Sequence, residues 1–321
     1  MTDIKGLIIK NKRTKSLINK AQKGNIALIA HSDLDELAAY SLVECKVSAV
    51  INTRKSCTGS YPNRGPGVLS SFNIPLYDIE SCFYSFINNG DTCEIINNKL
   101  FINGAYLCEL SPVINNIDNN TFIETIKEFM TNTWKYIDKE KDLLFRDIHL
   151  PYLNTKITNK DVLLVSRGHS FKEDLHSLIN YIKINEPIII GIDGGGDALI
   201  KEDIIPDIII GDMDSVSDSC LLKSKEIIVH GYLDGTAPGR YRIDKLGLEY
   251  KMFNFFGTSE DAAIIIAYLS NCKNIVLVGS HNNIIDFLEK GRKGMSSTTL
   301  IRSFIGDKII DVKGINNIIG D

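Results

Sequence analysis

Two aspartates in the second half of the chain are the clearest candidates for chemistry. Asp212 and Asp214 follow the apolar run Ile208–Ile210 and lie two residues apart. In extended backbone their side chains point the same way, roughly 7 Å apart, and at an effective dielectric of about 20 their repulsion is about 2.4 kcal/mol. A Mg²⁺ ion bridging them to a polyphosphate offsets this cost, because magnesium prefers one or two carboxylates with phosphate oxygens and water. The alternative is a solvated turn in which Asp214 or Ser215 caps the next helix.

A glycine-rich turn follows the preceding apolar run, Ile188–Ile192, and reads Asp193-Gly194-Gly195-Gly196-Asp197. Glycines at the start of a helix let backbone N–H groups approach an anion closely, and the helix N-terminus favours negative charge. Tight packing alone also explains such a turn. Arg167, which follows the run Val162–Val165, adds a side chain suited to bidentate phosphate contact.

A third acidic segment, Gly257-Thr258-Ser259-Glu260-Asp261, begins the predicted helix Ser259–Leu269. Acids in a first turn also serve as a helix cap, which is the structural alternative for Ser259. An arginine, a glycine-rich turn and acidic groups at successive strand ends are nevertheless more than packing requires. They favour a site for a phosphorylated ligand.

These residues need a sheet to bring them together, and the pattern from Asp161 onward predicts one. Strands that are apolar throughout alternate with helices, which is typical of a parallel sheet covered on both faces. In such sheets ligands bind at the carboxyl ends of the strands. The expected strands are Val162–Val165, Ile188–Ile192, Ile208–Ile210, Ile227–Val229, Met252–Phe256 and Ile275–Val278, with a helix over Phe171–Lys183.

The first half of the chain predicts a smaller α/β domain. Strands Ile26–Ala30 and Val47–Ile51 flank a helix Asp35–Glu44, and Asn88–Leu110 is typical of hairpins. Thr121–Phe145 is expected to be a long amphipathic linker helix. The fold class is therefore α/β, with an N-terminal domain at 1–118, a linker helix at 119–150 and a C-terminal parallel-sheet domain at 151–321.

Three further segments have a functional and a structural interpretation. Asp33 with Glu36 fits a variant of the helix capping box or a ligand contact, and the loop Gly59–Gly67 is long enough to cover a site. Arg240, in a loop rich in glycine and proline, is a candidate phosphate ligand.

The composition of the chain limits the remaining classes of function and location. The chain has 321 residues and a net charge of −4, so no nucleic-acid partner is expected. Its seven cysteines are scattered without a CxxC pair, and no apolar run approaches the roughly 20 residues needed to span a bilayer. We expect a cytoplasmic protein with reduced thiols.

The Asp-Gly-Gly turn, the segment from Ile205 to Ser215 and Ser259-Glu260-Asp261 resemble the catalytic domain of thiamin pyrophosphokinases. The resemblance implies Mg²⁺ and ATP as cofactors, with Asp212 and Asp214 as metal ligands. It implies Asp212, Asp214 and Asp261 as catalytic residues. The nucleotide and phosphate would be bound by Arg167, Asp193, Gly194, Gly195, Gly196, Asp197, Ser215, Thr258, Ser259 and Glu260. The 27 residues after Gly294 are too few for the thiamin-binding β-sandwich of that family, so this half of the site is expected to be missing.

A second resemblance covers most of the chain. Segments such as Ala30–Asp35, Gly59–Asn63, Gly211–Asp218 and Gly291–Met295 resemble the SteA family, whose members carry a pyrophosphokinase-like domain and are associated with bacterial cell division. This resemblance implies a homodimer that binds a nucleotide and a membrane-associated division protein. It also implies that the protein is held at the division site by that partner or by a further C-terminal segment. We expect a Mg-nucleotide-binding division protein; the alternative is an active pyrophosphokinase that transfers diphosphate from ATP to thiamin or another small alcohol.

Overall fold

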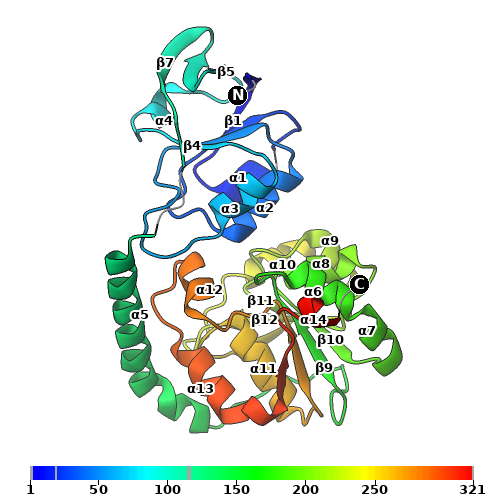
Figure 1. The fold of residues 1–321 in the computed structure, drawn as a ribbon. Helices are drawn as coiled ribbons and strands as arrows, with labels where there is room; N and C mark the ends of the chain where they lie inside the picture. Colours follow the sequence, from blue (N-terminus) through cyan, green and yellow to red (C-terminus); the bar gives the residue numbers. More distant parts are fainter. Residues whose placement is uncertain (1–2, 19, 114–116, 320–321) are drawn as a thin grey trace. The chain divides into compact units, whose positions relative to one another are not determined.

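The computed structural model describes residues 3–18, 20–113 and 117–319, which form two compact units, each built around its own sheet (Figure 1). The first unit is Met1–Phe129 together with Phe287–Arg292, and the second is Met130–Asp286 together with Lys293–Asp321. The expected ranges 1–118, 119–150 and 151–321 stay a prediction, and their outer ends, residues 1 and 321, lie outside the described residues.

The first unit contains an eight-stranded mixed sheet in the order β7-β6-β5-β1-β2-β3-β4-β8. The central strands β1 to β4 are parallel, while β5, β6 and β7 form an antiparallel meander beside β1 and β8 pairs antiparallel with β4. The meander confirms the predicted hairpins. The strands are β1 (Ile4–Lys10), β2 (Ile26–Ile29), β3 (Ala49–Asn52), β4 (Leu76–Asp78), β5 (Thr92–Ile96), β6 (Lys99–Ile102), β7 (Ala105–Glu109) and β8 (Ser111–Pro112).

Helices α1 (Thr14–Ile18), α2 (Glu36–Glu44) and α3 (Gly65–Ser71) cover one face of this sheet with Leu17, Leu42 and Leu69, all fully buried. The opposite face packs against side chains of the meander and the region of α4 (Phe83–Phe86). The alternation of apolar strands and helices therefore predicts this unit correctly.

The predicted linker helix is present as α5 (Asn119–Glu140), and its last predicted residues tighten into the 3₁₀ helix η1 (Lys141–Phe145). The boundary between the two units falls inside α5, after Phe129. Phe129 is buried and meets Phe287 edge-to-face, with ring centroids 6.4 Å apart. This contact places residues 287–292 in the first unit.

The second unit contains a seven-stranded sheet in the order β13-β12-β11-β10-β9-β14-β15, in which every neighbouring pair is parallel. Strands β9 to β13 extend to one side of β9 and β14 and β15 to the other, so the strand order reverses at β9 and β14. The strands are β9 (Val162–Val165), β10 (Ile188–Ile192), β11 (Ile208–Gly211), β12 (Glu226–Gly231), β13 (Lys251–Asn254), β14 (Ile275–Val278) and β15 (Ile309–Asp311).

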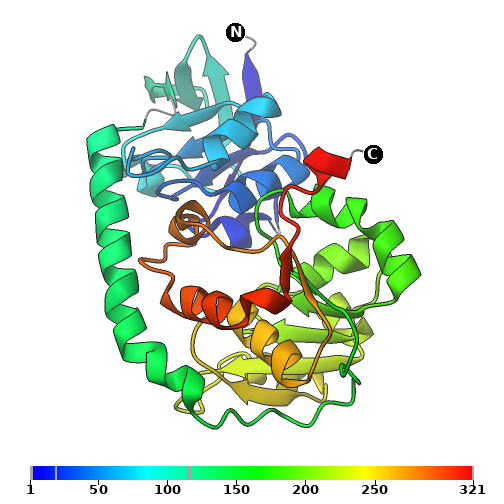
Figure 2. The same ribbon diagram turned by 60° about the horizontal axis from the view of Figure 1, so that its bottom comes forward.

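Helices cover both faces of this sheet, as the continuous apolar strands predict (Figures 1 and 2). One face packs against α6 (Phe171–Ser177), α7 (Ile179–Asn185), α8 (Gly195–Lys201), α9 (Asp218–Lys223) and α10 (Arg240–Leu246). The other packs against α11 (Ser259–Leu269) and α13 (Ser296–Ile305). The remaining short elements are α12 (Ile284–Glu289), η2 (Gly306–Lys308) and α14 (Asn316–Ile319).

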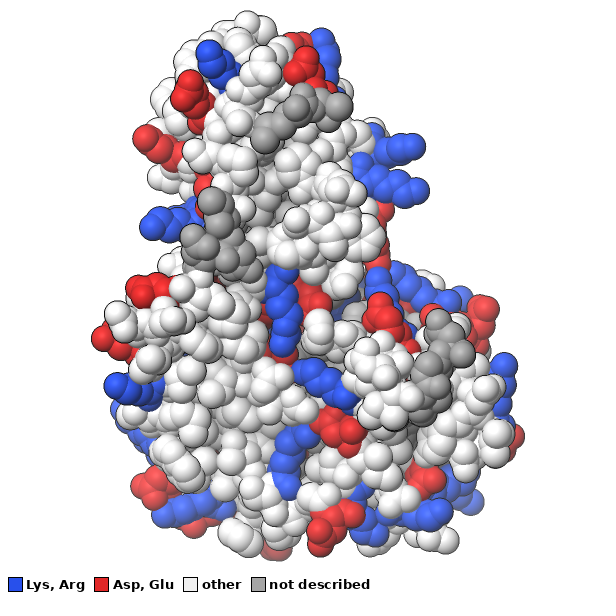
Figure 3. Space-filling model, viewed as in Figure 1, with Lys and Arg blue, Asp and Glu red and all other residues white. Residues whose placement is uncertain are grey.

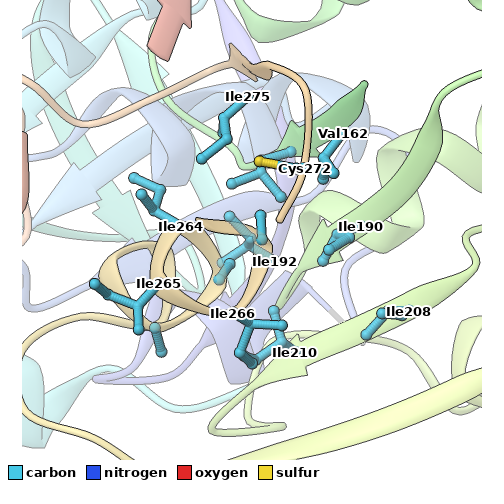
Figure 4. Packing of buried hydrophobic residues seen from close by; sticks show 14 of the residues in the cluster. Val162, Ile190, Ile192, Ile208, Ile210, Ile264, Ile265, Ile266, Cys272 and Ile275 are labelled. Atoms are coloured by element: carbon cyan, nitrogen blue, oxygen red, sulfur yellow. The ribbon is translucent and has the colours of Figure 1, made fainter. Parts of the chain in front are cut away.

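The core of the second unit is centred on α11. Residues Ala262–Ala267 are buried without exception, because the helix lies between the sheet and α13. Ile264, Ile265 and Ile266 pack in one cluster with strand residues such as Ile192 and Ile210 (Figure 4). This rigid layer fixes the start of α11 at the carboxyl ends of the strands.

One predicted element differs from the structure. The expected helix Phe171–Lys183 is two helices, α6 and α7, which meet at Leu178. Leu178 is buried in the core of this face and adopts φ −94° and ψ 0°, outside the helical region. An apolar period continues through such a break, so the sequence pattern does not reveal it.

Basic and acidic side chains are interspersed on the face shown in Figure 3, in keeping with the net charge of −4. Within the described residues, none of the helices combines the length and the apolar character needed to cross a bilayer.

Candidate functional site

The carboxyl ends of β10 and β11 bring Asp193 and Asp212 together. A Cβ at Gly211 would lie 1.9 Å from Asp193 Oδ1, so only glycine at this position lets the Asp193 side chain reach the end of β11. Asp193 adopts a left-handed backbone, φ 48°, and its N–H extends the sheet by donating to Ile210 O at 2.9 Å. Its Oδ1 accepts the Met213 N–H at 3.3 Å.

The two carboxylates interact directly. Burial, followed by the charge of Asp212 and a hydrogen bond between the two side chains, raises the pKa of Asp193 to about 7. The Met213 N–H and the Ser259 hydroxyl act in the opposite direction without cancelling the effect. A carboxyl pair that holds a proton near neutral pH is under electrostatic stress, which a cation between the two groups would relieve.

The rest of the Gly211–Ser215 turn is held by local hydrogen bonds. The Asp214 N–H donates to Asp212 Oδ1 at 2.9 Å, and Ser215 Oγ accepts the Gly194 N–H at 3.2 Å. Neither Asp214 nor Ser215 caps the next helix, because Ser217 does so by accepting the Cys220 N–H at 3.1 Å. The capping part of the structural alternative is therefore wrong, whereas Asp212 and Asp214 are both exposed, as in a solvated turn.

The glycine-rich turn has mixed roles. A Cβ at Gly195 would lie 1.9 Å from Val165 O, and one at Gly196 would lie 2.4 Å from Ile209 Cδ1, so these two glycines are required by the packing of α8 on the sheet. Gly194 is different, because its Cβ would meet Arg167 Cζ at 2.1 Å. The Arg167 guanidinium thus lies against the backbone of the turn, and its contact with phosphate stays a prediction.

Asp197 is engaged in the fold. Its carboxylate accepts the N–H and the hydroxyl of Ser217, the residue that caps α9. Asp197 therefore ties α8 to the start of α9, which gives a structural reason for an acid at this position, while its contact with a nucleotide stays a prediction.

The start of α11 corrects two expectations. Thr258, not Ser259, is the N-cap, and it forms a capping box with Asp261. Asp261 is fully buried and also accepts the hydroxyls of Ser297 and Thr298 at 2.7 and 3.0 Å. Burial raises the pKa of Asp261. With its carboxylate enclosed by α13, Asp261 stabilises the packing of two helices and is not placed to act as a catalytic acid.

Glu260 is also buried, but it is paired. It accepts hydrogen bonds from Ser166 Oγ at 3.3 Å, from the His281 N–H at 3.2 Å and from Arg302 at 3.2 Å. Burial alone would raise its pKa, but the contacts with His281 and the charge of Arg302 outweigh this and lower the pKa of Glu260 to about 2. Arg302 also pairs with Asp311 at 2.8 Å, so this network joins α11, α13 and β15 with the segments that follow β9 and β14.

Sequence reasoning missed a contribution from β12. The His230 Nδ1 lies 3.3 Å from Ser259 Oγ and its Nε2 lies 3.0 Å from the Phe255 carbonyl oxygen. Since that carbonyl only accepts, Nε2 carries a proton. His230 thus holds the hydroxyl that in turn contacts Asp193. The sequence contains no spacing that would have indicated this contact.

The loop after β12 also contacts the acidic turn. A Cβ at Gly239 would lie 2.2 Å from the Asp212 carbonyl oxygen, and the Arg242 guanidinium bonds Met213 O and Asp218. Arg240, the candidate phosphate ligand, lies over the ring of Tyr241, 5.0 Å from its centroid.

The acidic residues of the first unit have a structural explanation. Asp35, not Asp33, caps α2 by accepting the Ala38 N–H at 2.8 Å, and it also pairs with His31 at 3.2 Å. Asp33 instead accepts the Thr58 N–H at 2.7 Å. The expected capping box of Asp33 and Glu36 is therefore wrong.

The long loop of the first unit, Gly59–Gly67, is held by similar contacts. Asn63 is buried and donates to Leu34 O and Ser56 O at 2.9 and 2.8 Å. The Arg64 guanidinium lies between Glu36, at 3.5 Å, and Glu289, at 3.6 Å. Burial, together with the charges of Glu36 and Asp35, nevertheless raises the pKa of Glu289 to about 7, although Arg64 acts in the opposite direction.

The donor chemistry of the second unit fits Mg²⁺ bound together with a phosphorylated ligand. Among the described residues there is no group of three or more His, Cys, Asp or Glu side chains arranged to hold a metal ion by themselves. Magnesium, however, takes one or two carboxylates and completes its shell with phosphate oxygens and water. The Asp193–Asp212 pair supplies two, while Asp214 as a ligand stays a prediction.

Comparison with known proteins gives a distant relationship. No protein-family model matches the chain. It is 30% identical over 143 residues to a 6-hydroxymethyl-7,8-dihydropterin pyrophosphokinase of Methanocaldococcus jannaschii, and the match covers 38% of this chain and 59% of that protein. The chain thus spans less than two thirds of the length of this relative. The finding supports a pyrophosphokinase-like domain and gives no support to the SteA resemblance.

Solved structures show weaker likenesses. A thiamine pyrophosphokinase from Bacillus subtilis is 21% identical, with a TM-score of 0.29, over 47% of this chain and 59% of that chain. A 3-isopropylmalate dehydratase from Methanocaldococcus jannaschii is 14% identical, with a TM-score of 0.26, over 41% of this chain and 99% of that chain. TM-scores this low do not establish a common fold, so the α/β assignment rests on the strand pairing described above.

Proposed function

We propose that the second unit binds a Mg-nucleoside triphosphate, ATP or a close analogue, and transfers its terminal diphosphate to the hydroxyl of a small alcohol. The observation that supports this most directly is the Asp193–Asp212 pair, two facing carboxylates at the carboxyl edge of a parallel sheet with the Asp193 pKa raised to about 7. Such a pair is costly by itself and becomes favourable when a cation and a polyphosphate complete it. The sequence similarity to a pyrophosphokinase supports the same reaction class.

In this proposal Asp193 and Asp212 hold the magnesium ion, and Asp214 faces solvent beside them. When bound, Mg²⁺ neutralises charge on the phosphate oxygens. Arg167, lying against Gly194, supplies a bidentate contact to phosphate. The alcohol oxygen bonds to the β-phosphorus while the bond from that phosphorus to the α-phosphate oxygen breaks, which leaves AMP and a diphosphate ester, and the hydroxyl proton passes to water. The protein contributes chiefly position and charge neutralisation.

Calorimetry with Mg-ATP tests the binding step. We expect Asp212→Asn and Asp193→Asn each to lower the affinity at least about 100-fold, because either change removes one ligand of the cation. The matched control is Asp307→Asn, an exposed aspartate of η2, which is expected to bind like the wild type. Absence of binding by the wild type, or unchanged affinity in Asp212→Asn, would refute the proposal.

Phosphorus NMR tests the transfer step. With Mg-ATP and an acceptor alcohol, AMP and a new diphosphate ester should appear together in equal amounts. 6-Hydroxymethyl-7,8-dihydropterin and thiamin are the two acceptors to compare, since the former is named by the sequence relative and the latter by the family resemblance. Release of inorganic phosphate with no ester would show hydrolysis and exclude transfer to that alcohol.

Binding without turnover is the second candidate, and it corresponds to the expected role in cell division. Segments resembling SteA, such as Gly211–Asp218, support it. It predicts nucleotide affinity that depends on Asp212 but no AMP with either alcohol.

A further inference from the structure

We propose that the loop after β12 together with the first two residues of α10, residues 232–241, binds the flat heteroaromatic ring of a ligand whose phosphate chain or hydroxyl lies at the Asp193–Asp212 pair. This inference rests on the proposed function and adds the surface that recognises the ring. The loop begins at the carboxyl end of β12, the strand next to β11 in the sheet. It exposes two tyrosines, Tyr232 and Tyr241, whose exposed fractions are 64% and 66%.

The loop presents these rings from a fixed backbone. The Tyr232 N–H donates to Thr236 O at 2.8 Å, and the Gly235 N–H donates to Tyr232 O at 2.9 Å. The Asp234 carboxylate closes the same turn by accepting the N–H and the hydroxyl of Thr236. Ala237, at the other end of the turn, is buried in the core of this face. Because the backbone is already ordered, a ligand that stacks on the tyrosines loses little loop entropy on binding.

The loop is also attached to the acidic turn. Gly239 packs so closely on the Asp212 backbone that a Cβ there would lie 2.2 Å from Asp212 O. The Arg242 guanidinium bonds Met213 O, so the loop is joined to the turn at a second point. The loop and the acidic turn are therefore neighbours at the carboxyl edge, where we place a single ligand that carries both a ring and a charged end.

The side chains suit a planar, electron-rich or polarisable ring. Tyrosine offers a rigid, amphipathic face at low cost in side-chain entropy, and stacking of bases on aromatic side chains is tolerant of the exact ring. Arg240 lies 5.0 Å from the centroid of the Tyr241 ring, so a guanidinium accompanies the phenol. A guanidinium stacks on aromatic faces and also pairs with phosphate. Nucleobases and bicyclic alcohols such as pterins share this chemistry.

A matched control lies at the opposite edge of the same sheet. Tyr152 is 83% exposed and, like Tyr241, has a cation over its ring, Lys251 Nζ at 5.5 Å from the centroid. Lys251 is the first residue of β13, so this tyrosine marks the amino edge, away from the acidic pair. Tyr152→Ala therefore removes an equally exposed ring from the same unit without touching the proposed surface.

The test is calorimetry of Tyr232→Ala, Tyr241→Ala and Tyr152→Ala with four probes, namely Mg-ATP, Mg-tripolyphosphate, 6-hydroxymethyl-7,8-dihydropterin and thiamin. If the loop binds the nucleobase, at least one loop variant loses about tenfold or more in affinity for Mg-ATP and none for Mg-tripolyphosphate, which lacks a ring. If it binds the ring of the acceptor, the loss appears with the pterin or thiamin and not with Mg-ATP. Tyr→Phe at the responsive position should restore most of the affinity, since the ring is retained.

Other results would overturn the inference. If the wild type binds Mg-ATP and both loop variants bind all four probes as Tyr152→Ala does, the ring surface is refuted while the proposed function stands. If the wild type binds none of the probes, both are refuted. If the loop variants change the sedimentation coefficient and leave binding unchanged, the tyrosines form a contact between copies of the chain, which also refutes the inference.

Discussion

The two units present acidic residues at the carboxyl ends of their parallel strands in very different ways. In the first unit, each of the aspartates at this edge has a donor supplied by the fold, namely Thr58 for Asp33, His31 and the start of α2 for Asp35, and Ser56 for Asp78. In the second unit, Asp193 faces another carboxylate, that of Asp212. Asp193 also accepts the Met213 N–H and a hydrogen bond from Ser259, but these donors do not offset its burial and the charge of Asp212.

The difference shows that the number of acids at a sheet edge is a poor indicator of a site. When a carboxylate accepts hydrogen bonds from its own fold, its contribution to the stability of the fold explains why an acid is present. Two carboxylates that face each other repel, and a single substitution would remove this repulsion. A ligand that offsets the repulsion gives a reason for keeping both. The partners of an acid, rather than the acid itself, distinguish the two edges.

The comparison can be tested most strongly by creating a new unpartnered acid. Arg302→Leu should lower the free energy of unfolding by about 3–5 kcal/mol, because Glu260 stays buried without its guanidinium partner. The double variant Arg302→Leu/Glu260→Leu should recover part of this loss, since the buried Glu260 charge is gone, while Asp311 lacks its guanidinium partner in both variants. Urea unfolding measures both, with the exposed Arg146→Leu as the control. Equal losses in the single and double variants would contradict this account of Glu260.

The next largest effect concerns ligand binding. Asp193→Asn should weaken Mg-ATP binding about 100-fold, or about 2.7 kcal/mol, whereas Asp33→Asn and Asp78→Asn should leave it within about twofold. The reason is that the first-unit acids already have partners inside their own network. Calorimetry under one set of conditions provides the comparison. A large loss in Asp78→Asn would show that the two edges do not differ as described.

The pH dependence of stability should respond to the ligand in the second unit only. The Asp193 pKa is about 7 in the folded chain against an ordinary value of 3.8, so the folded state binds this proton more tightly than the unfolded state. Stability therefore falls as pH rises from about 4 to about 7, and it levels off above. Asp193→Asn should remove that decline, as should saturating Mg²⁺ with ATP.

Glu289 provides the counterpart in the first unit. Its pKa is also raised to about 7, from an ordinary value of 4.5, so Glu289→Gln should remove a decline over the same pH interval. Mg²⁺ with ATP should not reproduce the effect of this substitution. Urea unfolding at a series of pH values measures the effects of the substitution and of the ligand. If Mg²⁺ with ATP suppressed the Glu289 contribution, the proposed difference between the two units would be contradicted.

The smallest difference should be found at the helix starts, where the two edges are alike. Thr258→Ala and Asp35→Ala should each cost about 1 kcal/mol, because each removes an ordinary N-cap. Thermal unfolding measures the loss. If Thr258→Ala instead abolished Mg-ATP binding without lowering the unfolding temperature, Thr258 would belong to the site and not only to the cap.

Much of this fold is predictable because its strands are apolar throughout. Val162–Val165, Ile188–Ile192 and Ile275–Val278 agree residue for residue with the structure. The position of Asp193 and Asp212 at neighbouring strand ends follows from the same pattern and the geometry of parallel sheets.

The partners of the acids are what the sequence does not provide. Asp261 has the spacing of a first-turn acid, which is the same for a cap and for a ligand, and its hydroxyl partner Ser297 comes 36 residues later. Likewise, the pairing of Glu260 with Arg302 depends on the packing of α13 against α11. Long-range contacts of this kind leave no period or spacing in one sequence.

The assignment of residues 287–292 to the first unit has a consequence for evolution and for protein dissection. The chain on both sides of this segment belongs to the second unit, so the polypeptide passes from one unit to the other at three points. Excision of residues 130–321 would separate Phe287 from Phe129 and Glu289 from Arg64. The separation would expose an apolar ring and leave the Glu289 carboxylate without its Arg64 contact. Recombination by single crossovers would produce the same damage, so the two units are expected to have been inherited as one gene segment rather than exchanged as separate modules.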